Sequence, residues 1–260
     1  MGAIKSVYFG PERIKFTMTY CLGVKLKEGL VAIADTRITS GTDTTTAKKL
    51  FVHESGHGSL FLMTSGLRSV RDKAITYFKE VLKDETVIYT QLYEAVNAFG
   101  NQLRRVALED RIALNAAGFA FNLHTIVGGQ LKNDEEPKMF LLYPEGNWIE
   151  LTQTTPFMII GNSGYGKPIL NRTVKYESSL EEVLKAGFLS FDSTRVSAND
   201  VDFPLDVVVY YNNTFKMIEH RFEKKDMEII SSTWDNELKK ALDSIPEDWM
   251  NVVFDRKKAF

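Results

Sequence analysis

Cysteine is almost absent from this chain, because Cys21 is the only one among 260 residues. A single thiol excludes an intrachain disulfide framework and a cysteine-rich zinc site. It also fits a reducing compartment, so we expect a cytoplasmic protein. A domain of this length buries roughly three quarters of the surface that its unfolded chain exposes. Folding therefore needs neither a disulfide nor a structural metal.

Excess charge of one sign and long apolar runs are missing as well. Lys and Arg number 32 and Asp and Glu number 34, which leaves a net charge of −2. This balance argues against nucleic acid or an anionic membrane as a partner. No apolar run approaches the roughly 20 residues of a membrane span. Residues 1–17 are not a secretion signal, because Lys5, Glu12, Arg13 and Lys15 interrupt them.

The hydrophobic pattern predicts strands, two helices, strands, two helices, strands and a last helix. The predicted hairpins are 19–26 with 30–34, 49–53 with 59–63, and 207–211 with 215–222. The other predicted strands are 122–128, 138–143, 148–152 and 157–160. Helices are predicted over 67–82 and 92–106, from about 167, from about 180, and around Trp234, Leu238 and Leu242. Segments 39–46 and 133–136 are predicted to be loops, the second of them solvated.

This order lacks the alternation of strand and helix that builds a doubly wound parallel sheet. Two antiparallel sheets packed face to face, with helices outside both, account for it. We therefore predict an α+β fold, a four-layer αββα sandwich. No linker, low-complexity segment or repeat divides residues 19–260, so we expect one domain that follows an extension, 1–18. The tail 248–260 mixes apolar and basic residues, and either a docked helix or a subunit contact would explain it.

Met18-Thr19 looks like a protein start that lies inside the sequence. Cells commonly remove an initiator methionine that precedes a small residue, which would leave Thr19 with a free amine. Such a threonine can be a nucleophile whose own amine accepts the hydroxyl proton. Residues 1–18 would then be a misassigned start or a pro-segment cut before Thr19. If they stay attached, the proposed site is inactive.

Two charged residues suit such a nucleophile. A lysine cation, Lys49, would favour the ionised form of the Thr19 hydroxyl, and Asp35 would hold the lysine charged and oriented. Lys48 competes with Lys49 for this role, since neighbours on a strand point to opposite faces.

The segments TYCLGV (19–24), LVAIADTR (30–37), KKL (48–50) and IGNSGYGKPIL (160–170) resemble a proteasome β-type subunit. The nearest resemblance is to the bacterial group called the ancestral beta subunit (Anbu), and it covers roughly residues 18–245. It implies the sandwich of the N-terminal-nucleophile hydrolases, a threonine-type peptidase or amidase, and no metal or organic cofactor. It also implies that the lysine is the second of the pair, Lys49.

Further site residues follow from the resemblance and from local chemistry. The resemblance implies that the backbone N–H of Gly66, or of a neighbour in the Ser65-Gly66 turn, is the oxyanion donor. Ser163 lies in a small-residue turn whose N–H groups and hydroxyl could stabilise an oxyanion and relay a proton, although an ordinary strand-to-helix turn would look the same. The family also has an aspartate and a serine three residues apart. Asp192 and Ser197 are the candidates in this chain, with a different spacing, and Tyr20 departs from the usual Thr or Ser.

The resemblance implies self-assembly into a ring or an open spiral. An ATP-dependent unfoldase would be a further partner, although no segment of the chain identifies one. Two other functions stay open: a non-catalytic structural subunit that retains 1–18, and a zinc protease. The second rests on the H-E-x-x-H match at 53–57, which requires both His53 and His57 on one helix face. The surrounding residues instead favour a hairpin turn.

Overall fold

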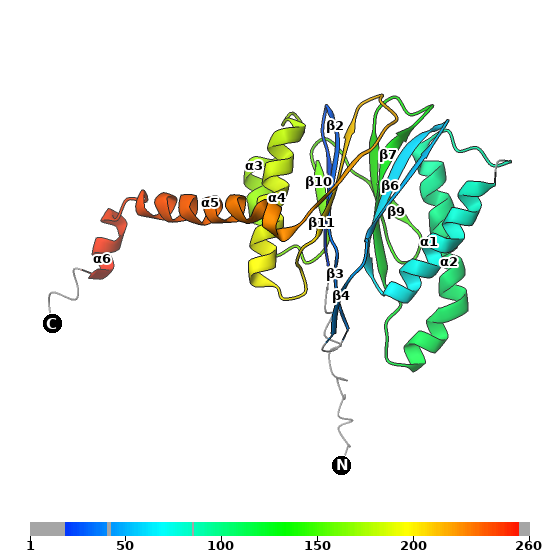
Figure 1. The fold of residues 1–260 in the computed structure, drawn as a ribbon, viewed down its shortest axis with the longest axis horizontal. Helices are drawn as coiled ribbons and strands as arrows, with labels where there is room; N and C mark the ends of the chain where they lie inside the picture. The colour runs from blue at the N-terminus through cyan, green and yellow to red at the C-terminus, as the bar shows by residue number, and fades with distance from the viewer. Residues whose placement is uncertain (1–18, 41–42, 85, 255–260) are drawn as a thin grey trace, which may run out of the picture.

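Two five-stranded antiparallel sheets lie face to face, and a pair of helices covers the outer face of each (Figure 1). The structure is a computed structural model, and it describes residues 19–40, 43–84 and 86–254. The layers run helix, sheet, sheet, helix, which confirms the predicted αββα sandwich. Both sheets are built from hairpins, as the pattern of short apolar runs and turns predicts.

The first sheet has the strand order β10-β1-β2-β11-β12 and the second has β5-β6-β7-β8-β9. The strands of the first are β1 (Tyr20–Lys25), β2 (Gly29–Asp35), β10 (Phe157–Gly161), β11 (Leu205–Tyr211) and β12 (Ile218–Phe222). Those of the second are β5 (Leu50–Ser55), β6 (Gly58–Gly66), β7 (Leu123–Leu131), β8 (Lys138–Leu142) and β9 (Trp148–Glu150). The longer helices are α1 (Arg68–Lys83), α2 (Leu92–Ala116), α3 (Lys167–Thr173), α4 (Leu180–Ser197) and α5 (Lys224–Asp243).

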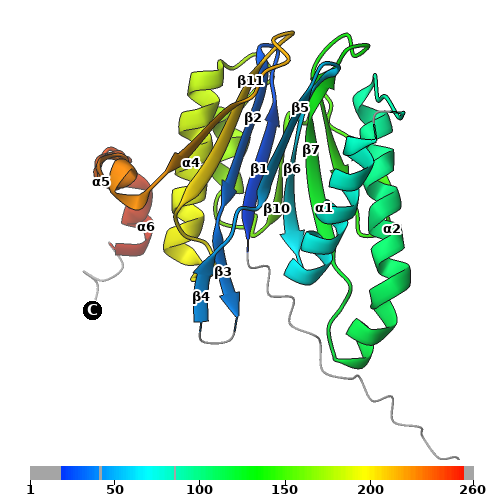
Figure 2. The ribbon, with the colours of Figure 1, turned by 45° about the vertical axis from the view of Figure 1, so that its right-hand side comes forward.

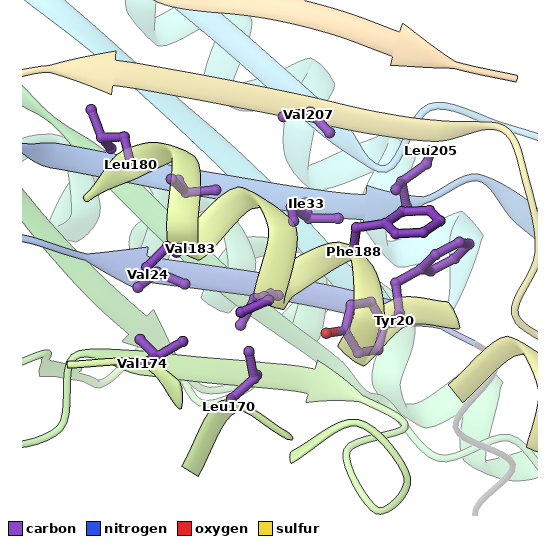
Figure 3. Close-up of a cluster of buried hydrophobic side chains, with 14 of the residues drawn as sticks. Tyr20, Val24, Ile33, Leu170, Val174, Leu180, Val183, Phe188, Leu205 and Val207 are labelled. Carbon is purple, nitrogen blue, oxygen red and sulfur yellow. The ribbon is translucent and has the colours of Figure 1, made fainter. Parts of the chain in front are cut away.

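Strand β1 shows why the sequences of the central strands are almost continuously apolar. Tyr20, Leu22 and Val24 point to the layer of α3 and α4, while Cys21 points to the second sheet. Every residue of β1 is buried, because both faces of the sheet are covered. Figure 3 shows α4 lying across β1 and β2, with Tyr20 and Val24 of β1 beneath it.

The prediction of a loop over 39–46 is wrong. Strand β3 (Arg37–Ser40) pairs with β4 (Asp43–Thr46) in a separate two-stranded ribbon that extends from the end of the sandwich (Figure 2). The run of threonines explains the difference, because threonine is polar enough to resemble a loop but is β-branched and favours strands.

The prediction that 133–136 is a solvated loop is also wrong at Asp134, which is only 6% exposed. Its Oδ2 accepts hydrogen bonds from Leu92 N and Leu131 N, each 2.9 Å long. Leu92 N is one of the N–H groups at the start of α2 that lack a partner within the helix. The acidic segment therefore joins α2 to the end of β7.

Helix α5 leads away from the sandwich (Figure 1), and Met227 is its one buried residue. It is followed by the turn η1 (Asp248–Met250) and by α6 (Asn251–Phe254), where Val252 and Val253 stay exposed. Up to residue 254, the tail is thus not docked on its own sandwich. None of the described helices is long and apolar enough to cross a membrane.

Replacing Asp134 with alanine tests the bond network between α2 and β7. We expect Asp134→Ala to lower the free energy of unfolding by about 2–4 kcal/mol, because two buried N–H groups lose a charged acceptor. The neighbouring Glu135 is exposed, so Glu135→Ala should change stability by less than about 0.5 kcal/mol. Denaturant titration of both variants measures this. Equal stability of the two variants would contradict the role given to Asp134.

Candidate active site

The peptide group that joins Thr19 to Tyr20 is fixed from both sides. Its carbonyl, Thr19 O, accepts a hydrogen bond from Asn162 N at 2.7 Å. Its N–H, on Tyr20, donates to Asp35 Oδ1 at 2.8 Å. Thr19 itself is 5% exposed. These two bonds therefore fix the orientation of the peptide plane immediately after the candidate nucleophile, Thr19.

Gly161 allows the first of these bonds to form. It pairs with Tyr20 across β10 and β1 and has a φ of 92°. A Cβ at this position would collide with Thr19 O. Glycine alone adopts this conformation without strain and leaves room for the close approach of the two strands.

Asp35 and Lys49 form a buried ion pair beside the same peptide. Lys49 Nζ lies 2.7 Å from Asp35 Oδ1, the oxygen that also accepts from Tyr20 N. The side chain of Lys49 is 4% exposed and that of Asp35 is 0% exposed. Lys48 instead pairs with Glu219 at 2.6 Å, and its side chain is half exposed. The structure thus places Lys49, and not Lys48, against Asp35.

Burial raises the pKa of Asp35 to about 6, while the charge and hydrogen bond of Lys49 and the N–H of Tyr20 act in the opposite direction. The carboxyl is therefore ionised at neutral pH but loses its charge in mild acid. The ion pair with Lys49 requires that charge, and the bond from Tyr20 N is stronger to a carboxylate than to a neutral carboxyl.

The end of β6 brings Gly66 to this part of the fold. Thr64 N donates to Lys49 O at 3.2 Å, and Cys21 Sγ donates to Thr64 O at 3.8 Å. Gly66 follows two residues later, is exposed, and has a φ of 145°. It lies next to α1 and on the side of the sandwich where Lys49 and β1 meet.

Ser163 lies in the turn between β10 and α3, one residue after Asn162, and is partly buried. Since Asn162 N already binds Thr19 O, this N–H is not available to an oxyanion. The turn therefore holds the backbone of Thr19 through Asn162. The hydroxyl of Ser163 is the side-chain group of this turn that could relay a proton.

Asp192 and Ser197 occupy different positions on α4. Asp192 Oδ1 accepts from Arg195 Nη2 at 2.6 Å and from Ser231 Oγ at 2.9 Å, so it ties α5 to α4. Ser197 is the exposed last residue of α4.

A different acid, Asp202, accepts from Arg37 Nη1 at 3.1 Å, two residues beyond Asp35. Pro204 O accepts from both the N and the Oγ1 of Thr36. The sequence pattern did not single out Asp202. The available signal for this contact was that Asp202 lies three residues before β11, the strand that pairs with β2.

The H-E-x-x-H match does not have the geometry of a zinc protease. His53 and Glu54 belong to β5, and His57 lies in the turn before β6. Glu54 binds Met217 N at 2.7 Å and Lys216 Nζ at 3.3 Å. Among the residues that the structure describes, no three His, Cys, Asp or Glu side chains come together as a metal site.

Comparison with known proteins agrees with this fold. The model of the proteasome subunit family matches residues 17–196. This range includes Thr19, Asp35, Lys49 and Ser163. The chain belongs to the proteasome subunit family. No curated protein matches the chain in sequence.

Solved structures of Anbu, the ancestral beta-subunit, are similar to this chain. Anbu from Hyphomicrobium sp. strain MC1 is 34% identical with a TM-score of 0.80, and the match covers 88% of this chain and 99% of that one. Anbu from Yersinia bercovieri is 29% identical with a TM-score of 0.82, over 88% and 98% of the two chains. The helical assembly of the Anbu complex from Pseudomonas aeruginosa has 30% identity and a TM-score of 0.83, over 88% and 97%.

The pH dependence of stability tests the burial of Asp35. Between about pH 4 and 6 the folded chain binds a proton that the unfolded chain does not. This stabilising contribution is complete below the unfolded pKa of 3.8 and is lost as the pH rises through about 6. The variant Asp35→Asn cannot titrate at this position.

We therefore expect the stability of the wild type, relative to Asp35→Asn, to fall by about 2 kcal/mol between about pH 4.5 and 7. Denaturant titrations at several pH values measure the difference. A difference that does not change with pH would contradict a buried, titrating Asp35.

Proposed function

We propose that this chain is an N-terminal threonine hydrolase that cleaves peptide or other amide bonds. The observation that supports this best is the double contact of Asp35 Oδ1, which binds Lys49 Nζ and the N–H of the Thr19–Tyr20 peptide. The Lys49 cation, the Asp35 carboxylate and the backbone of Thr19 are thereby held in one buried cluster. Such a cluster can activate a nucleophile by placing an oriented charge beside it.

In the proposed reaction, Thr19 Oγ attacks the carbonyl carbon of the substrate amide. The free amine of Thr19, directly or through water, accepts the hydroxyl proton and passes it to the leaving amine. The carbon–nitrogen bond breaks and an ester to Thr19 remains. A water molecule then attacks the ester, its proton returns to Thr19 Oγ, and the acid product leaves.

The other residues support this reaction from fixed positions. The cation of Lys49 favours the alkoxide of Thr19, and Asp35 holds Lys49 in place. The N–H of Gly66 stabilises the oxyanion, a role that mutations in other enzymes value at about 2.7–4 kcal/mol. Ser163 relays a proton. No part is assigned to Asp192, whose carboxylate binds Arg195 and Ser231, or to Ser197, the exposed last residue of α4.

Removal of the Thr19 hydroxyl tests the nucleophile. We expect the protein to carry Thr19 as its first residue and a β-lactone to add one ester at that residue, both detected by mass. Thr19→Ala should lose labelling and any hydrolysis while keeping the fold, and Thr86→Ala, at an exposed threonine, should keep both. Hydrolysis at the wild-type rate in Thr19→Ala would rule out the mechanism.

The same measurement separates the enzyme from its alternative, a structural subunit. A purified, assembled protein that retains the peptide bond between Met18 and Thr19 has no free amine at Thr19. That result, together with the absence of labelling, would favour the structural subunit.

We propose further that the chain assembles with copies of itself in the cytoplasm. The single cysteine supports this compartment. The Anbu complex from Pseudomonas aeruginosa forms a helical assembly, and this chain is 30% identical to it. In addition, α5 and the segment after it expose apolar side chains that a second copy could cover. These are Ile229, Ile230, Leu238, Leu242, Ile245, Trp249, Val252, Val253 and Phe254.

Charged substitutions on α5 test this surface. Leu238→Lys combined with Leu242→Lys should shift the sedimentation coefficient towards smaller species. Each buried leucine would otherwise contribute about 1.5–3 kcal/mol to association. Lys239→Glu, an exposed charge reversal on the same helix, is the control. Unchanged sedimentation of the double lysine variant would show that α5 is not an assembly surface.

A further inference from the structure

The Tyr20 side chain forms a buried link between the candidate nucleophile and α4. Its ring is fully buried and packs edge-on against Phe191, with 6.0 Å between ring centroids. Its hydroxyl donates to Ser190 Oγ at 2.7 Å. Figure 3 shows Tyr20 beneath α4, on the side of the first sheet that faces the helices.

Ser190 is itself held in place. It is fully buried in α4, and its carbonyl accepts from Thr194 Oγ1 at 2.8 Å. A Cβ at Gly166 would collide with Ser190 Oγ. This glycine therefore allows the turn between β10 and α3 to pack directly against Ser190. The hydroxyl of Ser190 thus lies where the Tyr20 ring and the turn that binds Thr19 O meet α4.

The backbone of Tyr20 carries this restraint to Thr19. The N–H of Tyr20 donates to Asp35, and the carbonyl of the same peptide group accepts from Asn162. These two bonds restrain rotation of the peptide plane, and the Tyr20 hydroxyl adds a third point of attachment. Burial raises the pKa of the Tyr20 phenol, so the hydroxyl keeps the proton that it donates.

We propose that Tyr20 and Ser190 are positioning residues, whose hydrogen bond sets the orientation of Thr19 for attack. This inference rests on the proposed hydrolase function. A misplacement of about 1 Å can cost a reaction roughly 100-fold in rate. Loss of the bond should therefore lower the rate of attack by Thr19 far more than it weakens binding of the reagent.

The test compares the reaction of Thr19 with a β-lactone in protein that begins at Thr19. The lactone ring opens, Thr19 Oγ forms the ester, and the hydroxyl proton passes to the ring oxygen. We expect Tyr20→Phe to lower the maximal labelling rate at least roughly 10-fold, with the half-saturating lactone concentration unchanged within about 2-fold. Exchange of the residue-20 amide with deuterium, measured by mass, should accelerate.

Tyr210→Phe is the matched control. Tyr210 is also fully buried in the first sheet, and its hydroxyl donates to Gln130 Oε1 at 2.8 Å. It pairs with Leu30, at the end of β2 opposite Asp35. Tyr210→Phe should lose thermal stability like Tyr20→Phe but label at the wild-type rate.

The double variant Tyr20→Phe with Ser190→Ala separates positioning from simple stability. It removes both polar groups, so no buried hydroxyl of the pair is left without a partner and thermal stability should recover. The labelling rate should stay low if the bond positions Thr19. A double variant that labels as fast as the wild type would overturn the inference.

Two failures can be told apart. A wild-type protein that does not react with the lactone contradicts the proposed function, and amide exchange then decides the positioning role alone. A reactive wild type with an equally reactive Tyr20→Phe contradicts only the positioning role. If the wild type does not react with the lactone, an amide exchange rate at residue 20 that is the same in Tyr20→Phe as in the wild type contradicts the positioning role.

Discussion

One carboxylate oxygen organises this end of the molecule. Asp35 Oδ1 accepts from a lysine ammonium and from the N–H that follows Thr19, in a place from which water is excluded. An isolated charge buried there would cost several kcal/mol or more, so the carboxylate is stable only with both donors present. Conversely, removing it would leave Lys49 as a buried charge without its carboxylate.

The three partners of this cluster come from both sheets. Asp35 and Tyr20 belong to β2 and β1 of the first sheet, whereas Lys49 directly precedes β5 of the second. The bond from Thr64 N to Lys49 O ties this lysine to β6. The site is therefore complete only when the two sheets have packed together, which links its assembly to the formation of the core between them.

The parts of the structure that depend on short-range patterns could be predicted from the sequence. The hairpins follow from apolar runs separated by turns, and Thr19, Asp35 and Lys49 sit at or beside strand ends that such hairpins define. The β3–β4 ribbon was not predicted, because threonine serves both strands and loops. Burial of Asp134 was not predicted either, because the acidic segment 133–136 does not indicate that the start of α2 packs against it.

Long-range partners were the hardest to predict. Ser190 is 170 residues from Tyr20, and Asp202 is 165 residues from Arg37, so no local spacing connects them. Asp192 is the predicted acid beyond Ser163, and its contact with Ser231 of α5 could likewise not be predicted from local spacing. Both contacts depend on how the elements after residue 180 pack on the first sheet, which local sequence patterns do not record.

The coupling between Asp35 and Lys49 can be measured directly with a double-mutant cycle on the labelling of Thr19. If the pair acts as one unit, Asp35→Asn and Lys49→Met should each lower the labelling rate roughly 100-fold or more, and the double variant should be no slower than the worse single variant. Single effects that multiply in the double variant would show that the two residues act independently, which would contradict a site built around one shared carboxylate oxygen.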